Sequence, residues 1–198
     1  MAWNKYFIVV TDQPAAEPRE IIQRLGIEGW KLKGQTEFSA TNKSDDLFIG
    51  HYNSHLVISN PDLVHSFFSD VVGEFEQRFI ETFPGSVIAV FMENSTVGLF
   101  GYSIIEGGQR IRLSDGSDGE IFHDFGSLLP EEEVIRSGDI FDPEELEEMR
   151  QDMDEEEVAA MITFEASWRV PKQLSKRYFG QSVEEVAEQI KLSQYVKS

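Results

Sequence analysis

The sequence predicts an α+β fold in which an antiparallel β-meander sheet is packed on one face by helices, with a helical, acidic C-terminal region. Three observations predict it. Short β-type segments separated by tight-turn residues fill residues 86–126. An apolar stripe at helical spacing fills residues 60–82, and helix-capping patterns recur after residue 141.

The N-terminal segments alternate between strand and helix patterns. Residues 6–10 form a continuous apolar and β-branched run, as expected for a strand covered on both faces. A short helix is expected at residues 21–25. Strict alternation over residues 30–33 predicts a strand with one solvent-exposed face, and residues 47–50 and 56–58 are expected to form two short strands joined by a turn.

The clearest helix is predicted for residues 60–82. Asn60 can accept hydrogen bonds from free backbone amides, Pro61 suits the first helical position, and Asp62 complements the helix dipole. Apolar residues follow at three- and four-residue spacing: Val64, Phe67, Phe68, Val71, Val72, Phe75 and Phe79. This stripe predicts burial against a sheet, and the alternative is the lining of a ligand pocket.

The central segments predict a meander. Residues 87–92, 97–105, 109–113 and 120–125 carry β-type patterns, and the links between them contain the Gly, Asn and Asp residues that tight turns require. Strands joined by such short turns cannot be parallel, because a parallel neighbour needs a long crossover connection. We therefore expect consecutive antiparallel strands, backed by the helix at 60–82.

Helix signals dominate the C-terminal third. Residues 142–145 combine a capping box with a proline in the first turn, and residues 154–157 repeat the capping pattern. Pro171 predicts a break, because the residue before a proline disfavours helical backbone angles. Two last helices are expected at 171–179 and 182–190.

The domain organisation is expected to be simple. The chain has 198 residues, which is long enough to bury one substantial core. It shows no internal repeat and no linker composition. We therefore expect one domain over residues 1–198, with the sheet and main helices in 1–126 and a helical extension in 127–198.

Composition argues against several classes of function. The chain has no cysteine, which excludes disulfides, thiol catalysis and cysteine-ligated metals and favours a reducing cytoplasm. No segment approaches the ~20 apolar residues of a membrane span. The formal net charge of -19 argues against nucleic acid and anionic membranes as direct ligands, because phosphate binding relies on clustered Lys and Arg. The oligomeric state is left open.

The negative charge is concentrated in one block. Residues 131–165 hold 15 acidic residues against Arg136 and Arg150, a net charge of -13, whereas the tail from residue 166 carries six basic and three acidic residues. The block is interpreted either as a solvated face or as a docking surface for a basic protein partner. The candidate partner-binding residues are Glu144, Glu145, Glu147, Glu148, Glu155 and Glu156.

A third interpretation uses the same charges within the chain. The tail residues Arg169, Lys172, Lys176 and Arg177 could fold back on the acidic helices and neutralise them. Replacement of the glutamates would then lower thermal stability and abolish no interaction.

Candidate metal ligands are few. His51 and His55 are four residues apart but flank a turn between strands, so they could meet only across the hairpin, with Asp45 or Asp46 as a third ligand. The acidic run at residues 115–120 lacks the spacing of an EF-hand loop and predicts a solvated hairpin turn. We predict no metal and no cofactor.

Candidate catalytic groups are equally sparse. His123 and Asp124 are adjacent on an expected strand and therefore point to opposite faces, so they cannot form an acid–base pair with each other. No phosphate-binding loop, dinucleotide fingerprint or nucleophile elbow is present, and no catalytic residue is predicted. Whether His51, His55 and His123 converge in a site is left open.

One part of the chain resembles a known family. It is the segment 97–133, with Gly107-Gly108, the run from Arg112 to Gly119, and the run from Phe125 to Glu131; Phe83-Pro84-Gly85 is similar to another family motif. These motifs resemble a family of uncharacterised bacterial proteins of about this length. The resemblance implies a bacterial cytosolic α+β protein and supplies no catalytic residue.

Two functional hypotheses follow. The first is a non-catalytic interaction protein, an accessory or immunity-type module that binds a basic partner through the acidic helices. The second is a small-ligand binder or hydrolase-like enzyme that uses a pocket beneath the Phe67 to Phe79 helix. Clustered histidines with convergent carboxylates in an apolar cleft would favour the second.

Overall fold

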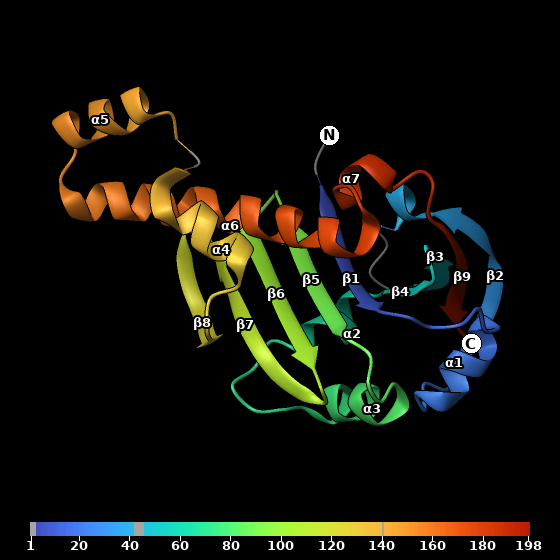
Figure 1. Ribbon diagram of the computed structural model, residues 1–198. Helices are drawn as coiled ribbons and strands as arrows, with labels where there is room; N and C mark the ends of the chain where they lie inside the picture. Colours follow the sequence, from blue (N-terminus) through green and yellow to red (C-terminus); the bar gives the residue numbers. More distant parts are fainter. Residues whose placement is uncertain (1–2, 42–45, 140) are drawn as a thin grey trace.

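The computed structural model describes residues 3–41, 46–139 and 141–198, and its centre is one open antiparallel sheet with helices on both faces (Figure 1). The strands are β1 (Asn4–Val10), β2 (Trp30–Glu37), β3 (Leu47–Tyr52), β4 (His55–Ser59), β5 (Ile88–Asn94), β6 (Leu99–Glu106), β7 (Gln109–Ser117), β8 (Glu120–Gly126) and β9 (Lys191–Lys197). The α-helices are α1 (Pro18–Arg24), α2 (Pro61–His65), α3 (Glu74–Thr82), α4 (Pro130–Val134), α5 (Pro143–Asp152), α6 (Glu155–Phe179) and α7 (Val183–Val186). A 3-10 turn (Phe38–Ala40) and a π-helical turn (Ile135–Asp139) complete the elements.

The sheet has the order β2-β9-β3-β4-β1-β5-β6-β7-β8, and every pair of neighbours is antiparallel. The predicted meander is confirmed, because β5, β6, β7 and β8 are consecutive both in the chain and in the sheet. The last link is shorter than expected. β7 continues to Ser117, so only Asp118 and Gly119 form the turn to β8.

Side chains alternate between the two faces of the sheet. In β1, Phe7 and Val9 join a core beneath α6 and α7, whereas Ile8 and Val10 join a second core that includes side chains of α1, α2 and α3. The expected burial of this strand on both faces is therefore confirmed, as is the α+β class. Helices cover both faces of the sheet, where the sequence predicted one.

The prediction of one helix over residues 60–82 is wrong, because α2 ends at His65 and α3 begins only at Glu74. Phe67 is fully buried in the intervening segment, whereas Val71 is 73% exposed. The Ser69 hydroxyl donates to the carbonyl of Val71 at 2.6 Å, and Arg110 donates to the carbonyl of Ser69 at 2.5 Å. These bonds satisfy the backbone in a non-helical path and compete with helix formation.

The predicted break at Pro171 is also wrong, because α6 runs through it without interruption. A proline inside a helix costs about 3 kcal/mol. Here the cost is offset by burial: Val170, Leu174 and Tyr178 of the same helix face are buried in the core beneath α6. Tertiary packing of one apolar face therefore decides the helix, as it does for most helices in proteins.

The last segment departs furthest from expectation. The helix expected at 182–190 is only the single turn α7, and residues 191–197 form β9, which lies between β2 and β3. The C-terminal part is therefore not wholly helical. Leu192 points into the core beneath α6 and Tyr195 into the opposite core, so β9 joins both layers.

A buried ion pair connects α4 to the sheet. Arg112 of β7 and Glu132 of α4 are both fully buried, and Arg112 Nε lies 2.8 Å and 3.0 Å from the two carboxylate oxygens. The same carboxylate accepts from the Tyr102 hydroxyl at 2.6 Å and from the backbone amide of Leu129 at 2.9 Å. Arg112 also donates to the carbonyl of Phe125 at 2.8 Å. The Arg112–Glu132 pair thus connects β6, β7, β8 and α4.

The position of β9 can be tested at Gly50 of β3. A Cβ added there would lie 2.4 Å from the backbone oxygen of Lys191, so Gly50→Ala is expected to lower the free energy of unfolding by about 1–3 kcal/mol. Gly34→Ala in β2 is the matched control, because a Cβ at Gly34 meets nothing within 4 Å. Urea unfolding measures both variants. Equal, small effects would contradict the placement of β9 beside β3.

Candidate functional site

The candidate site is a projecting helical arm. We define the acidic arm as residues 142–165, which comprise α5 and the first part of α6. It holds eleven acidic residues and one basic residue, Arg150. Figure 1 shows α5 and the N-terminal end of α6 reaching beyond β8, the edge strand of the sheet. Most of the acidic residues in the block 131–165 therefore lie on the arm, which projects away from the sheet and its covering helices.

Capping residues determine where the two arm helices begin. Asp142 accepts from the amide of Glu144 at 2.9 Å, and Glu145 accepts from the amide of Asp142 at 3.2 Å. Asp154 and Glu157 repeat this exchange at the start of α6. These capping boxes satisfy amides that no helical carbonyl reaches. Glu145 therefore has a structural role as well as a charge.

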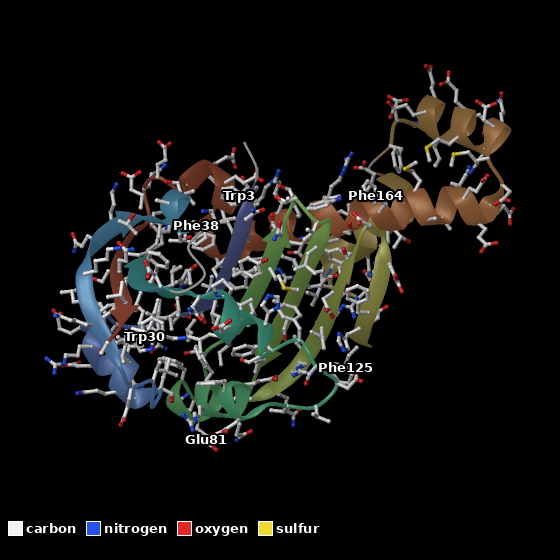
Figure 2. All side chains as sticks on the ribbon, turned by 180° about the vertical axis from the view of Figure 1, so that it is seen from behind. Trp3, Trp30, Phe38, Glu81, Phe125 and Phe164 are labelled. Atoms are coloured by element: carbon white, nitrogen blue, oxygen red, sulfur yellow. The ribbon has the colours of Figure 1, made fainter. Side chains whose placement is uncertain are left out.

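A thin apolar seam joins the two helices. Val158 of α6 is buried, and Leu146, Met149, Met153 and Ile162 are half-buried. Figure 2 shows sulfur atoms in the space between α5 and α6. A cavity of about 400 Å³ remains beside Met153 and Val158. Flexible methionine side chains suit such an irregular seam, and they leave all the carboxylates on the outside.

The six predicted partner-binding glutamates all lie on this arm, and all are exposed. No ion pair involves any of them within the ranges that the structure describes. The single hydrogen bond from another side chain is weak: Gln151 donates to Glu147 at 3.4 Å. The charge of these six carboxylates is therefore not neutralised by ion pairs within the described ranges.

Three basic residues of the C-terminal tail form ion pairs outside α5. Arg169 pairs with Glu165 at 3.1 Å, Lys172 pairs with Glu184 at 2.7 Å, and Arg177 pairs with Glu131. None of the ion pairs of these cations in the described ranges reaches a carboxylate of α5. Arg169 and Arg177 therefore neutralise the two ends of the acidic block, Glu165 and Glu131, whereas no described ion pair of the tail neutralises α5.

His51 and His55 do not form a site. In the β3–β4 pairing His51 is opposite Leu56, and His55 is opposite Tyr52. Leu56 faces the core beneath α1 to α3 and Tyr52 packs on the core beneath α6, so the two imidazoles lie on opposite faces of the sheet. Burial lowers the pKa of His51. Of the proposed third ligands, Asp46 accepts from Gln194 at 2.5 Å, and Asp45 lies outside the described residues.

His123 has a carboxylate partner that the sequence did not indicate. Its Nδ1 lies 2.7 Å from Asp115 of β7, whereas Asp124 contacts Arg112 on the opposite face. The expected separation of His123 from Asp124 is thus observed. Burial raises the pKa of Asp115, and His123 opposes this shift. Such a pair could orient an imidazole as a base.

The hydroxyl groups near His123 do not complete a catalytic site with the His123–Asp115 pair. The neighbouring segment carries two serines, but Ser66 donates its hydroxyl to the carbonyl of Leu63, and Ser69 donates to that of Val71. Neither hydroxyl is paired with the imidazole. The phenylalanines proposed to line a pocket are core residues: the rings of Phe67 and Phe79 are fully buried and pack edge to face at 5.4 Å.

Two buried acid–base groups lie beneath α6 and α7, and the sequence analysis missed both. Lys5 of β1 and Glu93 of β5 are cross-strand partners on this face. Lys5 Nζ donates to the carbonyls of Phe38 and Ser39 at 3.0 Å and 2.8 Å, and burial lowers its pKa to about 8. Burial, reinforced by the charge of Glu184, raises the pKa of Glu93 to about 7. The feature of the sequence that could have indicated them is that each charged residue stands in an otherwise apolar strand pattern.

Neither membrane nor metal geometry is found in the described residues. No helix there combines the length and the apolar character that a bilayer crossing requires. No three His, Asp or Glu side chains there are grouped as metal ligands would be. Comparison with protein-family models, curated proteins and solved structures finds no match to this chain.

The pKa of Glu93 gives a pH-dependent prediction. Because its folded pKa of about 7 exceeds the ordinary 4.5, the folded state holds a proton that the unfolded state releases. This group therefore lowers stability progressively as the pH rises from 4.5 to about 7. Glu93→Gln removes this loss, so the melting temperature of the variant relative to wild type should increase from pH 5 to pH 7.5. The exposed Glu188→Gln is the control, and parallel pH profiles for wild type and Glu93→Gln would contradict the burial of an ionisable Glu93.

Proposed function

We propose that the protein is a non-catalytic interaction module, of accessory or immunity type, that binds a basic protein partner through the acidic arm. One observation carries the proposal: the six candidate glutamates of the arm are exposed and form no ion pair among the described residues, while carboxylates of the body such as Glu76 and Glu132 bind buried arginines. Apart from the capping role of Glu145, these glutamates are therefore not used in holding the described part of the fold together.

The shape of the arm favours recognition of another macromolecule. Its two helices project from the sheet, and their exposed carboxylates are spread over a broad surface (Figure 1). Clustered charge of one sign accelerates the encounter with an oppositely charged surface. Because exposed charges are screened over about 8 Å at physiological salt, such binding is fast and salt-sensitive more than tight.

The enzymatic alternative has less support. The rings of Phe67 and Phe79 fill the core where the pocket was expected, and His51 and His55 lie on opposite faces of the sheet. Among the described residues, the His123–Asp115 pair could act as an acid–base group. Because neither Ser66 nor Ser69 pairs with the imidazole, it does not favour a reaction class.

Neutralising the arm should weaken partner capture and leave the fold intact. Replacement of Glu144, Glu147 and Glu148 by glutamine keeps both capping boxes, because Glu145 and Glu157 are untouched. Crowded carboxylates on one helix repel each other, so the melting temperature should be unchanged or slightly raised. Capture of a basic protein from the native cell by the immobilised chain, at 50 mM and 300 mM salt, measures the effect on binding.

A matched control distinguishes the effect of charge on the arm from the effect of the chain's total charge. The triple replacement of Glu28, Glu106 and Glu188 by glutamine removes the same charge from exposed sites of the body. Wild type and this control should capture the partner equally, and the arm variant should lose at least about tenfold in affinity at 50 mM salt. Equal capture by the arm variant at low salt refutes the proposal. A large drop in its melting temperature would instead indicate an internal role for these charges.

A further inference from the structure

The charges of α6 are completely segregated along the helix. Its acidic residues are Glu155, Glu156, Glu157 and Glu165, and its basic residues are Arg169, Lys172, Lys176 and Arg177. The helix has 25 residues, which at 1.5 Å per residue is about 37 Å. The first half therefore carries four negative charges and the second half four positive charges, with no charge of the other sign in either half.

The helix dipole explains only part of this pattern. Acidic residues near the N-terminus and basic residues near the C-terminus stabilise a helix, but the effect fades within the first and last turns. Glu165, Arg169 and Lys172 lie outside the first and last turns of α6. Their order is not required by the dipole.

Where the charge changes sign, α6 exposes an apolar stripe. Met161 is 38% exposed and Phe164 is 36% exposed, and Trp168 is half-buried. The spacing 161, 164 and 168 places the three side chains on one helix face. One side of Phe164 rests against the β7–β8 turn, where a Cβ at Gly119 would lie 3.5 Å from that of Phe164. Figure 2 shows Phe164 on α6 where the arm leaves the body.

We propose that this face of α6 binds a second copy of the chain, with the two α6 helices antiparallel about a two-fold axis near Glu165. In this arrangement residues 155–157 of one copy lie beside residues 172–176 of the other, and the apolar stripes meet at the axis. A two-fold interface repeats each contact, so both ends of both helices are charge-complementary.

The partner at this face is inferred from charge complementarity between two α6 helices. A helix that is negative in one half and positive in the other repels a parallel copy and attracts an antiparallel one. The intrachain pairs Arg169–Glu165 and Lys172–Glu184 are exposed, and such pairs contribute about 0–1 kcal/mol, so they can exchange for contacts between copies. The apolar stripe supplies the surface that is removed from water.

This inference shares Glu155 and Glu156 with the proposed partner-binding surface, but it can be tested separately from that function. The contact uses the stripe of α6, whereas the carboxylates Glu144, Glu147 and Glu148 lie on α5. Replacement of these three by glutamine should leave the association of two copies unchanged. Loss of partner capture and loss of self-association are therefore separate outcomes.

The test is a pair of charge-reversed variants studied by analytical ultracentrifugation at 50 μM chain and 25 mM salt. Glu155→Lys with Glu156→Lys gives these two positions the same sign as Lys172 and Lys176, which they face in the other copy, and Lys172→Glu with Lys176→Glu gives those positions the same sign as Glu155 and Glu156. Wild type should sediment as a dimer and each variant as a monomer, provided that circular dichroism shows native folding. An equal mixture of the two variants should regain the dimer, because each substituted pair of residues then faces a pair of the opposite sign.

A cross-link tests the axis without altering many charges. The chain has no cysteine, so Glu165→Cys introduces a single thiol close to its own counterpart across the proposed axis. Mild oxidation should convert this variant to a covalent dimer at least tenfold faster than the exposed control Glu188→Cys. Monomeric wild type, a monomeric mixture of the charge variants, or equal cross-linking of both cysteine variants would overturn the proposal.

Discussion

The buried ion pair between Arg112 and Glu132 is the constraint on which the rest of the architecture depends. Removing two charges from water is costly unless geometry and further hydrogen bonds compensate. Here Tyr102, the amide of Leu129 and the carbonyl of Phe125 complete the network. Burial, together with the neighbouring carboxylate, raises the pKa of Tyr102, so the hydroxyl stays a donor. The network fixes α4 on the sheet at β6 and β7, close to the edge strand β8.

This anchor explains how the arm is held. Val170, Leu174 and Tyr178 pack the C-terminal half of α6 on the sheet, and α4 lies against the same helix, where Arg177 binds Glu131. The N-terminal end of α6 extends beyond β8 and packs on α5 through the apolar seam (Figure 1). A rigid helix fixed at one end thus carries unpaired carboxylates outward. The proposed function is thus located on the acidic arm, outside the packed core of the sheet and its helices.

The sequence predicted local structure well and long-range structure poorly. The meander followed from turn residues, and the arm helices followed from the capping residues Asp142 and Asp154. The break predicted at Pro171 was wrong because the burial of Leu174 in the core stabilises the helix. The single helix predicted over 60–82 was wrong because the hydrogen bonds at Ser69 stabilise a non-helical backbone. Both are effects of tertiary structure. β9 was missed since only Leu192 and Tyr195 of its seven residues are buried. The acidic arm could be predicted as a charge block, but its projection depends on where α6 leaves the sheet.

The central claim is that the Arg112–Glu132 pair holds the α4–α6 platform. A double-mutant cycle of Arg112→Met and Glu132→Leu, measured by urea unfolding, tests it most directly. Each single change should lower the free energy of unfolding by about 3–5 kcal/mol, because it leaves a buried charge unpaired. The double variant should regain much of that loss and show strong coupling. Single changes that cost less than about 1 kcal/mol, or effects that simply add, would contradict the account.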